Sequence, residues 1–345
     1  KNNKTKTNIK GKTIVMQINR VDNYKNKVST DTLLEFYEKM LRFRRMSEKT
    51  AQMYQQGVIG GFCHLYTGQE AVLAGTFAST QKGDDHITSY RCHAHALACG
   101  IKEEEILAEL TGRATGISKG KGGSMHMFEP EKGYWGGHGI VGAQVPLGTG
   151  IAFYHKYMNS GKICVASMGD GASNQGQVYE SFNMASLWDL PVLYIIENNV
   201  YGMGTAAKRV CAGDLYKRGE AFDIKGEKVD GQDFFAVAEA VERARKFITE
   251  EKRPYIIEMD TYRYRGHSMS DPAKYRSKDE VKAVKENRDP MINLFDFLVE
   301  ERNIDEQQLK ELDKKVKAKL EKAVEFSLNS PLPDEAELMT DILPR

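Results

Sequence analysis

The sequence of 345 residues is poor in cysteine, nearly neutral in charge and without long apolar runs. An odd number of cysteines with no C-x-x-C spacing favours reduced thiols over a disulfide framework. The 49 basic and 48 acidic residues leave a formal net charge of +1, so the overall charge favours neither nucleic acid nor an anionic membrane as a partner. The longest apolar runs, such as residues 192–196, have only the length of a strand, which excludes a transmembrane helix. The five cysteines, most of them expected to be small packing residues, are Cys63, Cys92, Cys99, Cys164 and Cys211.

Two common nucleotide-binding motifs are also missing. No Gly-x-Gly-x-x-Gly opens a helix after a strand, so binding of NAD has little support. Residues 112–123 are rich in glycine and contain Lys119 and Lys121, but they lack the Gly-Lys-Ser/Thr of a Walker loop, which argues against ATP binding. We expect this segment to form a flexible, partly ordered wall of an active site, with a long surface loop as the alternative.

The most informative segments are two strand-like runs that each end in a polar turn. Residues 163–168 have strand composition and lead into Gly169, Asp170 and Gly171. Residues 192–197 form a second strand signal that ends before Asn198 and Asn199, and residues 173–187 between the two runs have the length of a helix. Such a strand–helix–strand unit places Asp170 and Asn199 at the carboxyl ends of strands, where open α/β folds bind ligands.

These polar groups suit a divalent cation that carries a diphosphate. Mg²⁺ prefers an octahedron of hard oxygen atoms, which one carboxylate, one amide oxygen, a backbone carbonyl, water and phosphate oxygens can supply. Gly171 and Ala172 leave room for backbone N–H groups to approach phosphate at the start of the following helix. Each turn alone is most often ordinary turn chemistry, and only the pairing of the two favours the site.

The pairing of Gly-Asp-Gly with Asn-Asn resembles the motif of the thiamin diphosphate fold. From about Leu33 onward, the chain resembles the α subunits of pyruvate dehydrogenase E1 components. The matching segments are GFCHLY at residues 61–66, KGKGGSMHM at 119–127, GGHGIVGAQVPLG at 136–148, GDGASNQGQ at 169–177 and YRYRGHSMSDP at 262–272. The E1 α subunits for branched-chain 2-oxoacids and for acetoin share the cofactor motif and remain the alternative. A more distant alternative is a non-catalytic binding module that keeps the fold.

The resemblance implies an α/β thiamin diphosphate-binding fold, with a central, mostly parallel sheet, helices on both faces and extra terminal helices. We expect residues 29–345 to form one such domain that includes a C-terminal helical extension. Residues 1–28 are rich in Lys and Asn and have no acidic residue before Asp22, so we expect a mobile basic N-terminal arm.

The resemblance also implies a set of site residues for thiamin diphosphate and Mg²⁺. The metal ligands would be Asp170, Asn199 and Tyr201. Two histidines would be catalytic: His64 would face the substrate, and His267 would order its loop and assist acyl transfer. The residues that would contact the cofactor are Tyr90, Arg91, Gly139, Val141, Asp170, Gly171, Ala172, Asn199, Arg263 and His267.

The implied reaction is the oxidative decarboxylation of pyruvate, with transfer of the acetyl group to the lipoyl domain of the dihydrolipoyl acetyltransferase E2. In the family, a separate E1 β subunit supplies the Glu that activates the cofactor, so we expect an α2β2 heterotetramer and no activity from this chain alone. Ser268 matches a serine that kinases modify in mitochondrial relatives, while Ala206 lies where a second such serine would be and Lys274 lies near the place of a third, in a segment one residue shorter. The expected location is therefore the bacterial cytoplasm, with the mitochondrial matrix as the alternative.

Outside the two central strands, periodicity predicts mostly helices. A helix should begin at Thr30, with Arg42, Arg44 and Arg45 on its solvated or subunit-facing side. His93 and His95 lack a third ligand at metal-binding spacing, so we expect structural roles for them. The other predicted helices are residues 68–79, 102–110, 143–153 and 234–248 and a group within 278–326, with a strand at 255–259 and a loop at 262–276.

Overall fold

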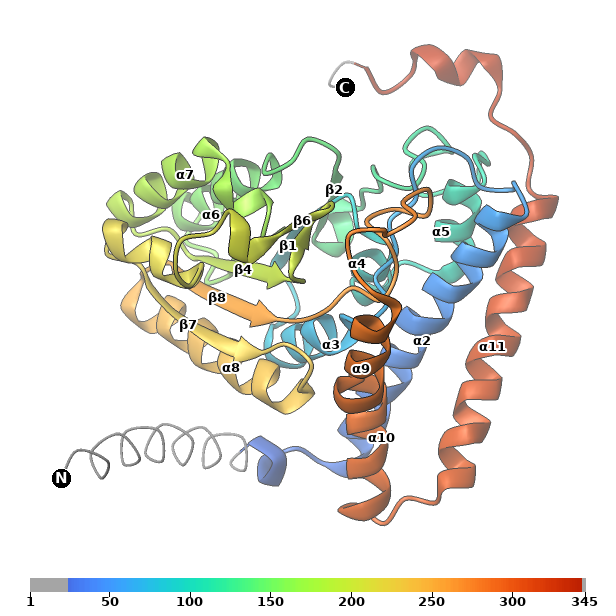
Figure 1. Ribbon diagram of the computed structural model, residues 1–345. Coiled ribbons are helices and arrows are strands. Elements are labelled where there is room, and N and C mark those ends of the chain that lie inside the picture. The colour runs from blue at the N-terminus through green and yellow to red at the C-terminus, as the bar shows by residue number, and fades with distance from the viewer. Residues whose placement is uncertain (1–23, 343–345) are drawn as a thin grey trace.

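The computed structural model describes residues 24–342 and contains a six-stranded sheet whose strands are all paired in parallel (Figure 1). This arrangement confirms the predicted α/β fold. The order across the sheet is β2-β1-β3-β4-β8-β7, so β3 and β4 lie side by side at its centre. The strands are β1 (Asp85–Ser89), β2 (Tyr134–His138), β3 (Cys164–Gly169), β4 (Val192–Asn198), β7 (Lys225–Asp230) and β8 (Tyr255–Asp260).

Alternating side chains along the central strands reach two separate hydrophobic layers. In β4, Tyr194 and Ile196 pack with helices α6 (Gln144–Tyr157) and α7 (Gly176–Leu187), whereas Leu193 and Ile195 pack with α8 (Phe234–Glu251). Helix α3 (Glu70–Ser79) lies beside α8 and contributes Val72 to that second layer. Figure 1 shows α6 and α7 on one side of the sheet and α8 on the other. A strand buried on both faces explains why residues 192–197 are continuously apolar up to Glu197.

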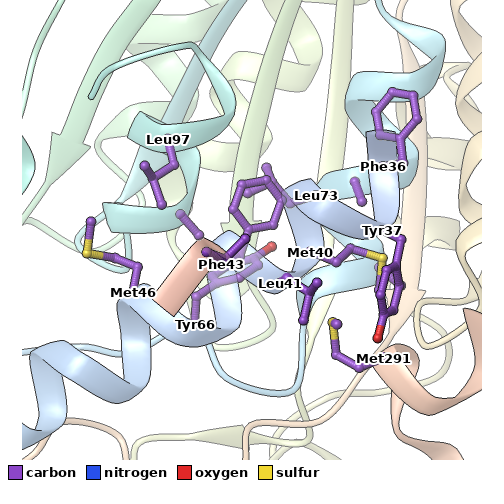
Figure 2. Close-up of a cluster of buried hydrophobic side chains, with 14 of the residues drawn as sticks. Phe36, Tyr37, Met40, Leu41, Phe43, Met46, Tyr66, Leu73, Leu97 and Met291 are labelled. Atoms are coloured by element: carbon purple, nitrogen blue, oxygen red, sulfur yellow. The ribbon is translucent and has the colours of Figure 1, made fainter. Parts of the chain in front are cut away.

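A helical extension forms a third cluster beside the sheet and contains the largest hydrophobic core. Its centre is α2 (Thr30–Gln55), whose side chains meet Tyr66, Leu73, Leu97 and Met291 from other segments (Figure 2). Ser29 caps the helix by accepting a hydrogen bond from the Thr32 N–H. The other helices of the region are α4 (His93–Ala98), α5 (Glu103–Leu110), α9 (Lys278–Arg288), α10 (Pro290–Glu300) and α11 (Glu306–Asn329).

The expectation that the arginines of α2 face solvent or another subunit was wrong. The Arg44 side chain is 12% exposed and donates hydrogen bonds to the carboxylates of Glu70 and Asp289. Arg42 pairs with Glu103 in the same way, and Arg45 pairs with Asp313 of α11 and with Glu48. These arginines hold the helical extension together because each charge finds a carboxylate within it.

The remaining segments are short or lie at the ends of the described chain. Of the predicted arm, residues 1–23 lie outside the described residues, while Tyr24 is buried in the core of the helical extension. Arg302 donates hydrogen bonds to the carbonyls of Lys25 and Val28. Within residues 24–342, no helix combines the length and apolar character needed to cross a membrane. The small elements are the hairpin of β5 (Tyr201–Gly202) and β6 (Thr205–Ala206), and the 3₁₀ turns η1 (Pro130–Lys132), η2 (Ala172–Asn174), η3 (Ala207–Arg209), η4 (Tyr216–Phe222) and η5 (Glu335–Met339).

Candidate cofactor site

A cavity of about 200 Å³ lies at the carboxyl ends of the central strands. Gly169 at the end of β3 is in register with Glu197 of β4, so the polar turns that follow these two strands reach the same edge of the sheet. Asp170 and Asn199 both line the cavity. The ten predicted site residues that form its wall are Tyr90, Arg91, Val141, Asp170, Gly171, Ala172, Asn199, Tyr201, Arg263 and His267.

Two glycines allow the turns to approach each other. A Cβ atom on Gly202 would lie 3.3 Å from the Cα of Gly171, and one on Gly171 would lie 3.4 Å from the Cα of Gly202. Since 3.3 Å is closer than most carbon contacts, a side chain on Gly202 would push the hairpin β5–β6 away from the turn that carries Asp170. The absence of a side chain thus keeps the oxygen-bearing residues of the two turns together.

The turn before β5 has an unusual backbone. Val200 has φ 76°, a left-handed conformation that is rare for a β-branched residue and that stores strain. The carbonyl of the next residue, Tyr201, accepts a hydrogen bond of 2.9 Å from Arg263 Nη1, which also donates to Asn199 Oδ1 at 3.0 Å. Strain of this kind often marks a functional site, because the surrounding structure must hold the turn in place.

Arg263 is almost fully buried, and its guanidinium is surrounded by neutral oxygens. Besides Asn199 and Tyr201, it donates to the Met203 carbonyl at 3.2 Å and to the Tyr275 hydroxyl at 2.9 Å. The Asn199 and Tyr201 oxygens therefore already face a positive charge. Because each such oxygen carries two lone pairs, both can accept a second cationic partner in the cavity.

The Asp170 carboxylate is buried without a matched ion pair. Its side chain is 2% exposed, and burial raises its pKa from an ordinary value of 3.8 to about 6. The positive charge of Arg263 and the backbone N–H groups of Gly171 and Asn199 act in the opposite direction but do not cancel the effect of burial. A buried carboxylate in this condition gains from a divalent cation, which would supply the missing positive charge.

The donors suit a hard cation better than a transition metal. Among the described residues, no group of three or more His, Cys, Asp or Glu side chains could hold a metal ion. The Asp170 carboxylate, the Asn199 amide oxygen and the Tyr201 carbonyl are oxygen donors of the type that Mg²⁺ binds, and a diphosphate and water would complete its octahedron.

Two histidine rings and one tyrosine ring pack at one side of the cavity. The centroid of the His64 ring lies 4.4 Å from that of Tyr90 and 5.1 Å from that of His267. Burial, together with the charge of Arg91, lowers the pKa of His64 to about 2 and that of His267 to about 4. Both rings are therefore neutral near pH 7. The Nδ1 atoms of both are buried without a hydrogen-bond partner, so each ring keeps an unused hydrogen-bonding position.

Arg91 joins the two chain segments that carry these histidines. Its guanidinium donates to the Leu65 carbonyl at 2.5 Å and to the His267 carbonyl at 2.8 Å. The Met269 N–H also donates to the Cys63 carbonyl at 2.8 Å, so the segments around His64 and His267 are connected on both sides. Arg91 therefore fixes the position of both rings, in addition to lining the cavity.

Two predicted site residues, His64 and Gly139, lie outside the cavity wall. His64 reaches the wall only through its ring contacts with Tyr90 and His267. Gly139 faces His126, whose ring would lie 3.1 Å from an added Cβ. Val141 does line the cavity, and its carbonyl accepts a hydrogen bond of 3.1 Å from Gln177.

The glycine-rich segment 112–123, expected to be an active-site wall, contributes no residue to the cavity wall. Glu109 holds its backbone in place. The buried Glu109 carboxylate accepts four hydrogen bonds from the backbone N–H groups of Ser118, Gly120, Gly122 and Gly123. Lys119 and Lys121 form ion pairs with Glu337 and Asp341 near the C-terminus. The segment is thus tied down at both its backbone and its side chains.

The sequence reasoning missed several residues of the site. Glu197 lines the cavity and could have been noticed, because it is an acidic residue at the end of an otherwise apolar strand. Ser89 was missed because β1 was not predicted. Gln69 does not line the cavity but donates to Glu197 and accepts from Asn199, and no local pattern in the sequence indicates this. The other missed wall residues are Gly142, Gly169, Gly202 and Met203.

Comparison with known proteins gives a consistent result along almost the whole chain. The family described as "Dehydrogenase E1 component" matches residues 38–335. A protein of Rickettsia felis named "Pyruvate dehydrogenase E1 component subunit alpha" is 54% identical over 319 residues, which cover 92% of this chain and 98% of that protein. A protein of the same name from Rhizobium meliloti is 53% identical over 90% of this chain and 89% of its own length. A protein of Dictyostelium discoideum has the same name with the addition "mitochondrial". It is 51% identical over 90% of this chain and 82% of its own length.

Proposed function

Because this chain belongs to the dehydrogenase E1 component family, we propose that it is the α subunit of a pyruvate dehydrogenase. In this role it catalyses the thiamin diphosphate-dependent oxidative decarboxylation of pyruvate, with transfer of the acetyl group to a lipoyl group. The names of relatives that are more than 50% identical over at least 90% of the chain support pyruvate as the substrate. The structural observation that carries the proposal is the convergence of Asp170, Asn199 and Tyr201 around one cavity.

When bound, thiamin diphosphate supplies a thiazolium ring that accepts the electron pair released as CO₂ leaves the 2-oxoacid. Asp170, Asn199 Oδ1 and the Tyr201 carbonyl would bind Mg²⁺, and the ion would hold the diphosphate. Tyr90, Arg91 and Arg263 would neutralise the remaining phosphate charge, and the N–H groups at Gly171 and Ala172 would contribute hydrogen bonds. The Gly139 and Val141 carbonyls would accept hydrogen bonds from the aminopyrimidine ring.

The two histidines are the proposed catalytic residues of this chain. His64 and His267 are neutral near pH 7, so each can donate a proton from one ring nitrogen and accept one at the other. We assign His64 to orienting the substrate and His267 to proton management at the cofactor and during acyl transfer. Their packing against Tyr90 would restrict both rings, which keeps the ring nitrogens in place for the reaction.

We further propose that an E1 β subunit completes the site, in an α2β2 heterotetramer that passes acetyl groups to the lipoyl domain of E2. An exposed apolar surface supports a protein partner: on α6, Phe153 and Tyr157 are 47% and 79% exposed. The Phe153 ring contacts both Tyr157 and Trp188, and Leu187 at the end of α7 is 69% exposed. Apolar surface of this kind usually marks a binding interface. The relatives from Rickettsia and Rhizobium favour the bacterial cytoplasm as the location, with the mitochondrial matrix as the alternative.

The proposal is tested by combining the chain with the E1 β subunit of the same organism and measuring CO₂ release from pyruvate and from branched-chain 2-oxoacids. For acetoin, which has no carboxyl group to lose, the release of acetaldehyde is measured instead. We expect kcat/KM to be highest for pyruvate, activity to require thiamin diphosphate and Mg²⁺, and the α subunit alone to be inactive. A preference for a branched-chain acid or for acetoin would assign the chain to one of those enzymes instead.

Calorimetric titration of the complex with thiamin diphosphate and Mg²⁺ addresses the more distant alternative. We expect saturable binding that needs both components. A complex that assembles but binds neither would identify a non-catalytic module.

A further inference from the structure

Gln69 lies directly behind Asn199, on the side away from the cavity. It is fully buried at the residue that precedes α3. Its side-chain amide is bonded at both ends: Nε2 donates to Glu197 Oε2 at 3.3 Å, and Oε1 accepts from Asn199 Nδ2 at 2.8 Å. A row of three polar side chains therefore runs from Glu197 through Gln69 to Asn199.

The carboxylate at the end of this row gives it a direction. Glu197 is the acceptor in both of its hydrogen bonds here, one of 2.9 Å from the Tyr66 hydroxyl and the one from Gln69. Gln69 must therefore turn its NH₂ group toward Glu197 and its oxygen toward Asn199. Asn199 must in turn direct its own NH₂ group toward Gln69, which leaves its oxygen facing the cavity and Arg263.

We infer that Gln69 is a positioning residue, which acts with Arg263 to set the orientation of the Asn199 amide so that its oxygen and not its NH₂ group meets the metal ion. This inference rests on the metal site proposed above. An Asn side chain is nearly symmetrical in shape, so packing alone cannot distinguish its oxygen from its nitrogen, and the distinction must come from its hydrogen-bond partners. A turned amide would place N–H groups against both the guanidinium and the metal ion.

The backbone around Gln69 is well held, so its amide acts from a fixed place. The Gln69 N–H donates to the Tyr66 carbonyl at 3.2 Å. The neighbouring Gly68 N–H donates to both oxygens of Glu70, and the Gly68 carbonyl accepts from the Thr261 hydroxyl. A Cβ atom on Gly68 would lie 2.3 Å from the Tyr262 carbonyl, so this turn packs tightly against the segment that leads to Arg263.

The test measures metal affinity in the assembled enzyme. The full-length chain is combined with its β subunit and saturating thiamin diphosphate, and free Mn²⁺ is quantified by electron paramagnetic resonance. Gln69→Met keeps the length of the side chain but removes both hydrogen bonds. We expect it to weaken Mn²⁺ binding about 10- to 100-fold, the usual cost of losing a residue that orients a metal ligand. Activity should recover toward the wild-type kcat at saturating metal, because only the binding of the ion is impaired.

Gln232→Met is the matched control. Gln232 is also buried and bonded at both ends of its amide, to the Thr261 hydroxyl at 2.6 Å and to the Arg288 carbonyl at 2.9 Å, but it does not contact Asn199. We expect it to lower the melting temperature as Gln69→Met does, with Mn²⁺ affinity unchanged. Equal Mn²⁺ affinities for the two variants would overturn the role of Gln69. If instead the wild-type enzyme binds no Mn²⁺, the proposed metal site itself is wrong.

Asn199→Asp provides a second test, because it should reverse the direction in which Gln69→Met changes Mn²⁺ affinity. A carboxylate presents oxygen on both sides, so it needs no orientation, but in the wild-type background one of its oxygens would face Gln69 Oε1 and repel it. Gln69→Met removes that repulsion. We therefore expect the double variant to bind Mn²⁺ more tightly than Asn199→Asp alone, although Gln69→Met weakens binding in the wild type. A double variant that is weaker than Asn199→Asp would contradict the inference.

Glu197→Gln covers the case in which Gln69→Met fails to fold, because it keeps the shape of the side chain. An amide at residue 197 can either donate or accept, so the row of amides loses its direction. We expect Mn²⁺ affinity to fall in this variant also, although Glu197 is not among the proposed metal ligands. An unchanged Mn²⁺ affinity in Glu197→Gln would show that the carboxylate does not set the direction.

Discussion

Two clusters of buried charge differ in how far their members satisfy one another. In the helical extension, Arg44 makes four hydrogen bonds to two carboxylates, those of Glu70 and Asp289. In the cavity, Arg263 donates to neutral oxygens, and the Asp170 carboxylate is left without a matched partner. The first cluster is complete within the chain. The second has spare acceptor capacity and a buried negative charge that Arg263 balances only in part, which favours the binding of a cation.

The proton affinities of the two clusters reflect this difference. Burial would lower the pKa of Arg44, but the carboxylates of Glu70 and Asp289 outweigh burial and raise it above its ordinary value. For Asp170, burial prevails over Arg263 and raises the carboxyl pKa to about 6. A charged group that is stabilised by its neighbours contributes to the fold, whereas one that is destabilised can be used for binding.

Replacing Asp170 should produce the largest functional loss. We expect Asp170→Asn to lower the affinity for thiamin diphosphate and Mg²⁺ by at least about 1,000-fold, more than the 10- to 100-fold cost of losing a residue that only orients a ligand. The melting temperature of the cofactor-free protein should not fall. Calorimetric titration and a thermal melt measure both effects, and a normal affinity in this variant would remove the basis of the proposed site.

Replacing Arg44 should produce the largest loss of stability. Arg44→Met leaves two buried carboxylates without their cation, and we expect the free energy of unfolding to fall by about 3–5 kcal/mol. Arg45→Met is the control: the Arg45 side chain is 26% exposed, and losing its pairs should cost only about 1 kcal/mol or less. Urea denaturation of the two variants compares them. A smaller loss for Arg44→Met than for Arg45→Met would contradict the contrast drawn above.

The raised pKa of Asp170 predicts a pH-dependent stability of the cofactor-free protein. Because the carboxyl binds its proton more tightly in the folded state, its protonation stabilises the fold below pH 3.8, and this contribution disappears as the pH rises through about 6. A change in pKa from 3.8 to about 6 corresponds to about 3 kcal/mol, at about 1.4 kcal/mol per pH unit. Asp170→Asn lacks this titration.

The measurement is the difference in unfolding free energy between Asp170→Asn and the wild type, in chelator-containing buffer at a series of pH values. The advantage of the variant should increase from pH 4 to pH 7. A difference that stays constant over this range would show that Asp170 is not destabilised by its burial.

A change at Glu109 should have the smallest effect. Glu109→Gln keeps one acceptor oxygen, so some of the four hydrogen bonds from the backbone of residues 118–123 are lost. We expect the free energy of unfolding to fall by about 1–3 kcal/mol. We expect faster hydrogen exchange in residues 118–123 and little change in cofactor affinity, because Glu109 belongs to a satisfied cluster. A large loss of cofactor affinity would instead make this segment part of the site.

The sequence alone predicts the centre of the fold better than its edges. Strands β3 and β4 are apolar because both faces of the sheet are covered, and such runs are visible in any sequence. Strand β7, with the sequence KGEKVD, lies at the edge of the sheet and has no fully buried residue, so its sequence pattern resembles that of a loop. Strand β2 contains two adjacent glycines, which weaken any strand signal. In the structure, β2 and β7 pair with their neighbours through backbone hydrogen bonds, which the amino-acid composition of the strands does not reveal.

Within the candidate site, the sequence predicts the residues that end strands but not those that orient them. Asp170 and Asn199 follow apolar runs and are therefore recognisable. Gln69 is 130 residues from Asn199, and Asp289 is 245 residues from Arg44. Hydrogen bonds over such separations depend on how the helices pack on the sheet. For the same reason, the sequence alone suggests a solvated or subunit-facing side for the arginines of α2, although Arg44 pairs with the buried carboxylates of Glu70 and Asp289.

The contact between Gly171 and Gly202 offers a way to obtain a subunit that folds but is inactive. A methyl group at residue 202 needs only a small shift of the hairpin, since its nearest neighbour would be 3.3 Å away and no other atom would lie within 3.7 Å. Gly202→Ala should consequently fold and assemble normally while holding its proposed oxygen donors too far apart. In the proposed α2β2 heterotetramer, mixing this variant with wild-type chains would yield particles in which one half is inert, so that communication between the halves could be studied without a chemical inhibitor.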